Sequence, residues 1–213
     1  MTLKLRTGSQ LVAYLDDEIA WRHKEIIELR ALATVALGKR ANVHVRAGIA
    51  LLYAHWEGFI KNAANAYVNY LSHRSDKTRD LQDCFVALSV KAKLSSMAQS
   101  AKSSVAVPVV GHLLSTLDLP ANLPDAGLSA DSNLNADVFQ NIAGWLGLDT
   151  AKYSSRFPLI DESLLAARNK IAHGEYLTMN ASRFAALSDE ILDLMKWFKT
   201  DIENAVATSA FLR

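Results

Sequence analysis

Three polar residues, Arg168, Asn169 and His173, interrupt an otherwise apolar helical pattern that ends at Gly174. A histidine titrates near neutral pH and can transfer protons, whereas the planar guanidinium of an arginine is suited to binding phosphate. Each type also has a structural explanation, because one hydrogen bond can satisfy a core histidine and a carboxylate can satisfy an enclosed arginine. The helix faces on which these side chains lie therefore decide between chemistry and structure.

A helical wheel at about 100° per residue predicts one narrow buried stripe for residues 160–173. The stripe consists of Ile160, Leu164, Ala167 and Ile171. Asn169 and His173 are four residues apart and lie together on the opposite face, so both are expected to point away from the core. Arg168 lies between the stripe and a second apolar pair and is expected to be partly enclosed beside an anionic partner. That partner is a structural carboxylate such as Glu57, or a phosphate, and the two are compatible.

The rest of the chain predicts the helices that must position this segment. Apolar residues recur at three- and four-residue steps in six stretches, at about residues 9–37, 42–73, 76–102, 135–147, 160–173 and 181–211. No alternating strand pattern of useful length and no internal repeat is present. We therefore expect an all-α bundle in one domain, residues 1–213, with an up-and-down four-helix core and additional helices. An irregular excursion is expected at about residues 103–135, which hold all but one of the prolines.

Composition and charge restrict the classes of function. The chain has 213 residues, of which 50% are hydrophobic, and a formal net charge of +1. The length and the apolar share predict one folded core. The near-zero net charge excludes a positive potential over the whole surface that would attract nucleic acid, so any polyanion site must be local. Cys84 is the only cysteine, which favours a reducing compartment. No signal-peptide pattern is present, and the longest apolar run falls far short of the roughly 20 residues that span a bilayer. We expect a soluble, cytoplasmic protein without a membrane segment.

The segment "RNKIAH" at residues 168–173 matches the Arg-x-x-x-x-His motif of the HEPN superfamily, in which a polar residue often follows the arginine. The context is also similar, because the motif closes a late helix and is followed by one more long helix. The segments "LLYAHWEGFIKNAANAYVNYL" and "SNLNADVF" resemble those of a prokaryotic HEPN branch found at toxin–antitoxin and phage-defence loci. The resemblance spans most of the chain and implies an HEPN-like helical bundle.

This resemblance implies a metal-independent endoribonuclease that acts as a toxin or anti-phage effector. Such an enzyme needs no cofactor and no metal, and it leaves a 2′,3′-cyclic phosphate and a 5′-hydroxyl. His173 would transfer protons, Arg168 would stabilise the charge on the phosphate, and Asn169 would orient the phosphate or the imidazole. His55 and Glu57 lie in the most buried part of a family-like segment and are candidates for supporting these three residues.

One chain supplies only one motif histidine, and Arg168 and His173 lie about 140° apart around a helix. HEPN proteins are typically dimers, so the resemblance implies a homodimer whose two motifs face one RNA, with an antitoxin protein as a further partner. Some related toxins carry a modifiable tyrosine two residues after the motif histidine, where this chain has Glu175. The alternative is a non-catalytic HEPN module that binds RNA, a nucleotide or a partner protein.

Overall fold

The computed structural model describes residues 3–36, 38–100, 102–124 and 133–213. The α-helices among them are α1 (Gly8–Val35), α2 (Lys39–Ser72), α3 (Asp83–Ser89), α4 (Lys91–Ala98), α5 (Ser103–Thr116), α6 (Ala136–Trp145), α7 (Ala166–Ala172) and α8 (Ala181–Ala207). Two 3₁₀-helices, η1 (Thr78–Asp80) and η2 (Ala151–Arg156), and a π-helix, η3 (Leu159–Leu165), complete the set. No strand occurs in these ranges, so the predicted all-α fold is confirmed. None of the described helices has the length and apolar character needed to cross a membrane.

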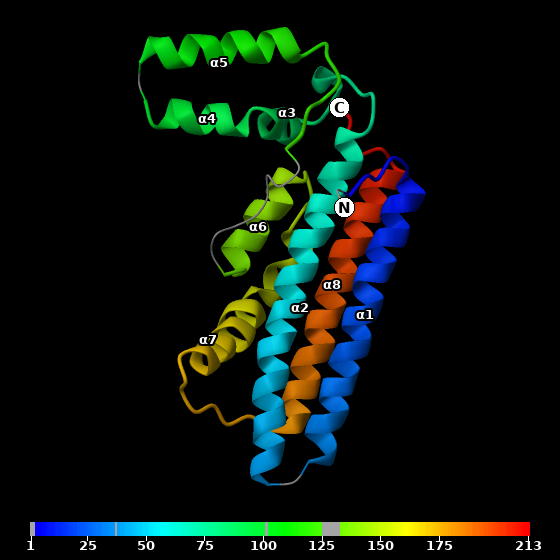
Figure 1. The fold of residues 1–213 in the computed structure, drawn as a ribbon, viewed down its shortest axis with the longest axis vertical. Helices are drawn as coiled ribbons and strands as arrows, with labels where there is room; N and C mark the ends of the chain where they lie inside the picture. The colour runs from blue at the N-terminus through cyan, green and yellow to red at the C-terminus, as the bar shows by residue number, and fades with distance from the viewer. Residues whose placement is uncertain (1–2, 37, 101, 125–132) are drawn as a thin grey trace.

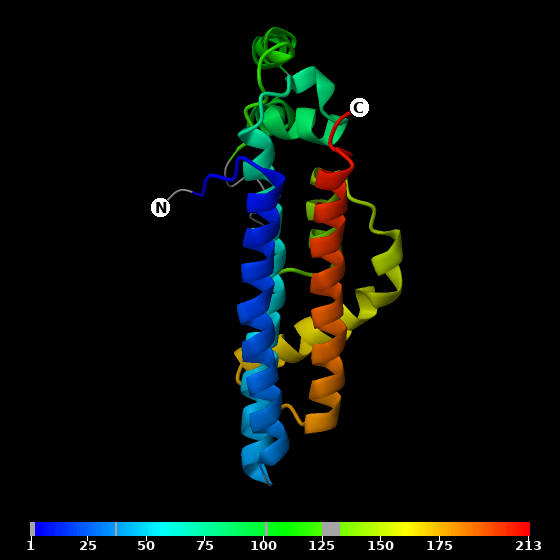
Figure 2. The ribbon, with the colours of Figure 1, turned by 90° about the vertical axis from the view of Figure 1, so that its right-hand side faces the viewer.

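Three long helices, α1, α2 and α8, lie side by side and enclose the core, as Figures 1 and 2 show. The apolar stripe of the last helix is buried and consists of Phe184, Leu187, Ile191, Leu194, Phe198 and Ile202. A side chain at Gly48 of α2 would collide with the ring of Phe184, so this glycine permits the close approach of α2 and α8. Burial of each large apolar side chain contributes about 1.5–3 kcal/mol, and this packing holds α2 in the centre.

A shorter fourth member of the bundle, η3 followed without a break by α7, crosses α2 obliquely (Figure 1). The helix predicted over residues 160–173 is therefore present, but its first half is a π-helix, in which the N–H of Ala166 bonds the carbonyl of Asp161. π-Helical turns are rare and often occur at functional sites. The predicted stripe is buried at Ile160, Leu164 and Ala167 and half-buried at Ile171.

The single helix predicted over residues 76–102 is wrong, because the chain forms η1, α3 and α4 there. Leu81 leaves the helical conformation and pairs with Leu212 near the C-terminus. Val90, with φ −114° and ψ 9°, then separates α3 from α4. Phe85 of α3 is anchored in the core, whereas α4 has no buried residue. Apolar residues do recur at helical spacing over residues 76–102, but only those of the first half pack against the core.

The excursion expected at residues 103–135 is partly helical, because Ser103–Thr116 forms α5. Pro108 leaves one carbonyl without its helical partner, and the exposed surroundings of that turn allow water to take its place. Residues 125–132 of the excursion lie outside the described residues. Figures 1 and 2 show that α4 and α5 form a hairpin at the end of the bundle that carries both chain termini, away from α7.

Candidate functional site

The motif helix α7 ends at His173 in a hydrogen-bonded turn that requires a glycine. Gly174 adopts φ 75°, and its N–H bonds the carbonyl of Ile171 at 3.1 Å. The N–H of Glu175 bonds the carbonyl of Lys170 at 2.8 Å, which completes a Schellman motif. The turn fixes the backbone of His173, while the imidazole is exposed and makes no hydrogen bond within the described residues. The predicted outward orientation of His173 is confirmed.

Arg168 is half-buried and lies against an aromatic ring from α2. Its guanidinium carbon is 4.8 Å from the centroid of the Tyr53 ring. Its Nη1 donates a hydrogen bond to Oδ1 of Asn169 at 2.9 Å. Asn169 is therefore half-buried rather than fully exposed, because its side chain turns towards Arg168. The guanidinium has further N–H donors with no partner among the described residues, and these are available to an anion.

The ring of Tyr53, a residue that was not selected from the sequence, lies against the guanidinium of Arg168. It is 2% exposed, and its hydroxyl oxygen accepts a hydrogen bond from the N–H of Leu134 at 2.7 Å. Burial, reinforced by the negative charge of Glu57, raises the pKa of Tyr53 to about 12, although Arg168 acts in the opposite direction. Tyr53 is thus a neutral phenol near pH 7. Its position four residues before Glu57, on the same face of α2, was the available signal.

The proposed ion pair between Arg168 and Glu57 is not formed. Glu57 instead accepts a hydrogen bond from Nζ of Lys61 at 2.7 Å, one turn further along α2. Arg168 makes no ion pair with any residue that the structure describes. The prediction failed because a lysine four residues away on the same helix is a nearer partner for the carboxylate. The charge of Glu57 also helps to raise the pKa of Tyr53.

His55 belongs to the contact between α1 and α2 and is not brought to the motif. It is 4% exposed, with Nε2 3.0 Å from a carboxylate oxygen of Glu25. Its ring also makes an edge contact with Trp21, at a centroid distance of 5.3 Å. Burial lowers the pKa of His55, and the charge of Glu25 partly offsets this effect. His55 and Glu57 are two positions apart, which corresponds to about 200° around α2, so the two side chains face different neighbours.

The three family-like segments meet around Tyr53 and η3. Leu134, in the second segment, bonds Tyr53 of the first. Two residues later, the N–H of Ala136 donates to Oδ1 of Asp161 in η3 at 2.8 Å. Asn135 between them caps α6 by accepting a hydrogen bond from the N–H of Val138 at 2.8 Å. This short segment is therefore hydrogen-bonded both to α2 and to η3, the helix that leads to the motif.

A second set of contacts holds the chain just after the motif. Nδ2 of Asn42 donates to the hydroxyl of Tyr176 at 2.8 Å. Nη2 of Arg46 donates to the carbonyl of Glu175 at 3.2 Å, and its guanidinium carbon lies 5.8 Å from the Tyr176 ring centroid. Both donors come from the beginning of α2, and no sequence pattern indicated them. The turn that carries His173 is thus tied to α2 on its C-terminal side.

This end of α7 presents an imidazole, an arginine with unused donors and a primary amide. Such a set can bind a phosphate and move protons at neutral pH. Within the described residues, no three histidine, cysteine, aspartate or glutamate side chains gather where they could hold a metal ion.

The chain was compared with known proteins. The family model described as HEPN_MAE_28990-like HEPN matches residues 11–211. The match covers the three family-like segments and both ends of the bundle. No curated protein and no solved structure matches the chain significantly.

Proposed function

Because the chain belongs to the HEPN_MAE_28990-like HEPN family, we propose that it is a metal-independent endoribonuclease. It cleaves RNA by attack of a 2′-hydroxyl on the adjacent phosphate and leaves a 2′,3′-cyclic phosphate and a 5′-hydroxyl. The observation that carries the proposal is the exposed imidazole of His173 at the fixed end of α7, on the same helix as the Arg168–Asn169 pair.

Each motif residue has a role that its contacts support. His173 accepts the proton of the 2′-hydroxyl or delivers one to the leaving 5′-oxygen. Arg168 directs its unused N–H donors at the phosphate, where negative charge grows as the new bond forms. Asn169 accepts from Arg168 through Oδ1, so its NH₂ group remains to donate to a phosphate oxygen. Tyr53 keeps the guanidinium of Arg168 in one orientation.

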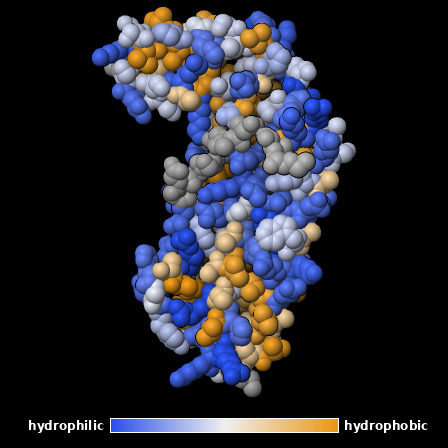
Figure 3. Space-filling model, viewed as in Figure 1, coloured by the Kyte–Doolittle hydropathy of each residue, from blue (hydrophilic) through white to orange (hydrophobic). Residues whose placement is uncertain are grey.

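Two proton transfers are needed for one cleavage, and each chain contributes one motif histidine. We therefore propose that two chains pair and share the site. An exposed apolar patch on the α1–α2 hairpin supports this assembly, and Figure 3 shows apolar surface gathered over that end of the molecule. The patch comprises Leu32, Val35, Val43 and Leu51, of which Val35 and Val43 are 75% and 63% exposed. Contiguous exposed apolar patches commonly mark protein interfaces.

The chain just after the motif reaches the same end of α2 as the patch. Val43 is next in sequence to Asn42, which bonds Tyr176 just beyond His173. A second copy that covers Val43 would therefore lie beside the end of α7. We further propose a toxin or anti-phage role for the protein, restrained by an antitoxin protein. A small open reading frame adjacent to its gene would support that pairing.

The decisive experiment is RNA cleavage in EDTA. We expect the purified protein to cleave RNA without added metal, and His173→Ala to lower the rate by a factor of about 10² or more, the usual scale of acid–base catalysis. His23→Ala, which removes another exposed histidine, is the matched control and should cleave normally. Mass spectrometry of the fragments should find cyclic phosphate ends.

Three results would contradict this mechanism: strict dependence on a divalent metal, full activity of His173→Ala, or fragments with a 5′-phosphate. RNA binding without any cleavage would instead indicate a non-catalytic HEPN module.

A further inference from the structure

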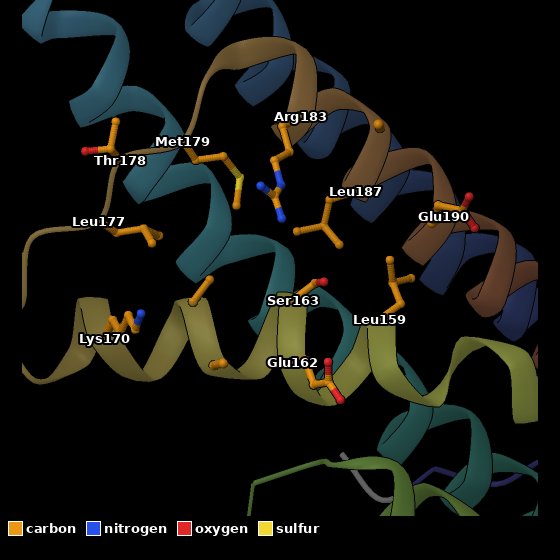
Figure 4. A pocket seen from close by; sticks show the side chains of 13 residues that line it. Leu159, Glu162, Ser163, Lys170, Leu177, Thr178, Met179, Arg183, Leu187 and Glu190 are labelled. Atoms are coloured by element: carbon orange, nitrogen blue, oxygen red, sulfur yellow. The ribbon is translucent and has the colours of Figure 1, made fainter.

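A cavity of about 430 Å³ opens on the side of the motif helix that faces α8. Figure 4 shows its two walls, which are η3 and α7 on one side and residues 177–179 with the beginning of α8 on the other. Its volume is in the range of small-molecule sites, about 300–1,000 Å³. None of the residues assigned to RNA cleavage lines it, so it is separate from the motif although it shares the helix α7.

Apolar side chains form part of the inner surface of the cavity. Ala166 and Ala167 line the α7 wall, and their small side chains leave the space open. Met179 and Leu187 line the opposite wall, and Figure 4 shows both side chains directed towards the interior. Ala167 and Leu187 are 6% and 5% exposed, so the floor of the cavity is continuous with the core. This surface favours a ligand with an apolar body.

Two basic side chains, Lys170 and Arg183, line the cavity together with two acidic ones. Figure 4 shows the guanidinium of Arg183 projecting between the walls near Met179 and Leu187. Neither Arg183 nor Lys170, which also lines the cavity, forms an ion pair with any residue in the described ranges. One of the two carboxylates of the lining is already paired. Glu190 pairs with Arg156, whereas Glu162 lies on the η3 wall beside Ser163.

The number of donors favours a carboxylate over a phosphate. Arg183 offers one planar fork, which matches the two oxygens of a carboxylate. The hydroxyl of Ser163 has no hydrogen-bond partner among the described residues and can donate to the same group. The backbone N–H of Arg183 already donates to Oδ1 of Asn180, so this amide at the start of α8 is not free for a phosphate.

We propose that this cavity binds a small organic carboxylate with an apolar tail. The carboxylate accepts hydrogen bonds from Arg183 and Ser163, Lys170 adds to the local positive potential, and the tail lies over Ala166 and Leu187. Occupancy adds contacts to α7 on the face opposite Tyr53. This site is independent of RNA cleavage, because none of its groups takes part in that reaction.

The test is calorimetric titration of the full chain with octanoate, below its micelle concentration and without RNA. We expect saturable binding of octanoate and much weaker binding of octan-1-ol and octylamine, which keep the tail but lack the anion. Arg183→Gln should weaken octanoate binding about tenfold, the usual scale of a charge-assisted hydrogen-bond pair. Lys93→Gln, which removes an exposed charge on α4, should bind octanoate like the wild type.

A second variant tests the shape of the cavity. Ala186 lines the cavity from α8 and is exposed, so Ala186→Leu should fill the space without harming the fold and should abolish binding. Equal binding of octanoate and octan-1-ol, unchanged affinity in Arg183→Gln or Ala186→Leu, or tighter binding of octyl phosphate would each overturn the proposal. RNA is absent from the titration, so the result is separate from the outcome of the cleavage experiment.

Discussion

Arg168 is held by an aromatic ring rather than by a carboxylate. A partner carboxylate would neutralise the guanidinium and compete with a phosphate, whereas the Tyr53 ring orients it and leaves its charge available. A cation–π contact of this kind contributes about 0.5–2 kcal/mol, which is enough to favour one orientation of a half-buried arginine. This single contact explains how the motif can be ordered and still ready to bind an anion.

The raised pKa of Tyr53 makes stability fall at alkaline pH. Its pKa is about 12 in the folded chain and about 10 when unfolded, so the unfolded chain loses this proton first as the pH rises. The contribution is complete below pH 10 and is lost as the pH approaches about 12. Each such tyrosine lowers the free energy of unfolding by about 1.4 kcal/mol per pH unit in this window. Burial also raises the pKa of Tyr67 and Tyr153, so we expect a steep loss of stability above pH 10.

Urea denaturation of Tyr53→Phe measures how much this residue contributes to the free energy of unfolding and to its pH dependence. The variant should lose about 1–3 kcal/mol near neutral pH, because the N–H of Leu134 loses its acceptor. Its slope above pH 10 should be shallower by one proton, while RNA cleavage persists because a ring remains beneath Arg168. Tyr176→Phe, at an exposed tyrosine, serves as the control for the alkaline slope only, because it also removes the acceptor of Nδ2 of Asn42. An unchanged slope in Tyr53→Phe would contradict the assignment.

At the scale of elements, the end of α7 depends on the conformation of Gly174. Its φ of 75° is strained for any residue with a Cβ, although a Cβ there would meet no atom within 4 Å. Gly174→Ala should therefore cost about 1–2 kcal/mol through the backbone alone and should slow cleavage by displacing His173. Gly174→Asn should lose less, because asparagine tolerates this conformation.

Chemical denaturation and cleavage rates measure both effects of the Gly174 variants. Gly111→Ala is the control, because that glycine lies inside α5, also has open space around it and does not have a positive φ. It should raise stability slightly, since alanine favours a helix by up to about 1 kcal/mol over glycine. Equal stability of Gly174→Ala and the wild type would show that the turn does not need its glycine.

Helices that pack against the core over their whole length were predicted correctly from the sequence, and helices that pack over only part of it were not. The helices now seen as α1, α2 and α8 keep one buried stripe over their length, so three- and four-residue spacing was sufficient. The same spacing failed over residues 76–102, because residues of the first half, such as Leu81 and Phe85, reach the core whereas α4 has no buried residue. The proline signal failed for α5, because an exposed helix can tolerate Pro108.

Within the site, residue type located the motif, but contacts between elements were not predictable. Arg168 and His173 were selected from their chemistry and from the resemblance of "RNKIAH" to the HEPN motif. Their supports, Tyr53 and Arg46, depend on the angle at which α7 crosses α2, which no local pattern encodes. The π-helical turn of η3 also escaped detection, because a wheel assumes one constant rotation per residue.

At the scale of the whole molecule, the proposed site is complete only when two chains meet. A single α7 offers one imidazole, and the apolar patch on the α1–α2 hairpin remains uncovered. Burying this patch between two copies would remove apolar surface from water and bring a second motif towards the first. Assembly and catalysis are therefore expected to fail together when the patch is disrupted.

Val43→Glu tests this coupling. The wild type should be a dimer by light scattering, whereas Val43→Glu should be a folded monomer that no longer cleaves RNA, because a buried unpaired carboxylate is costly at an interface. Val107→Glu is the matched control: it places the same charge at a valine of α5 that is 67% exposed, and it should keep both the dimer and the activity. Mixing Arg168→Ala with His173→Ala should restore part of the activity, since their heterodimer carries one intact arginine and one intact histidine on different chains. A wild-type monomer that cleaves RNA, or a Val43→Glu dimer of normal affinity, would contradict the shared site.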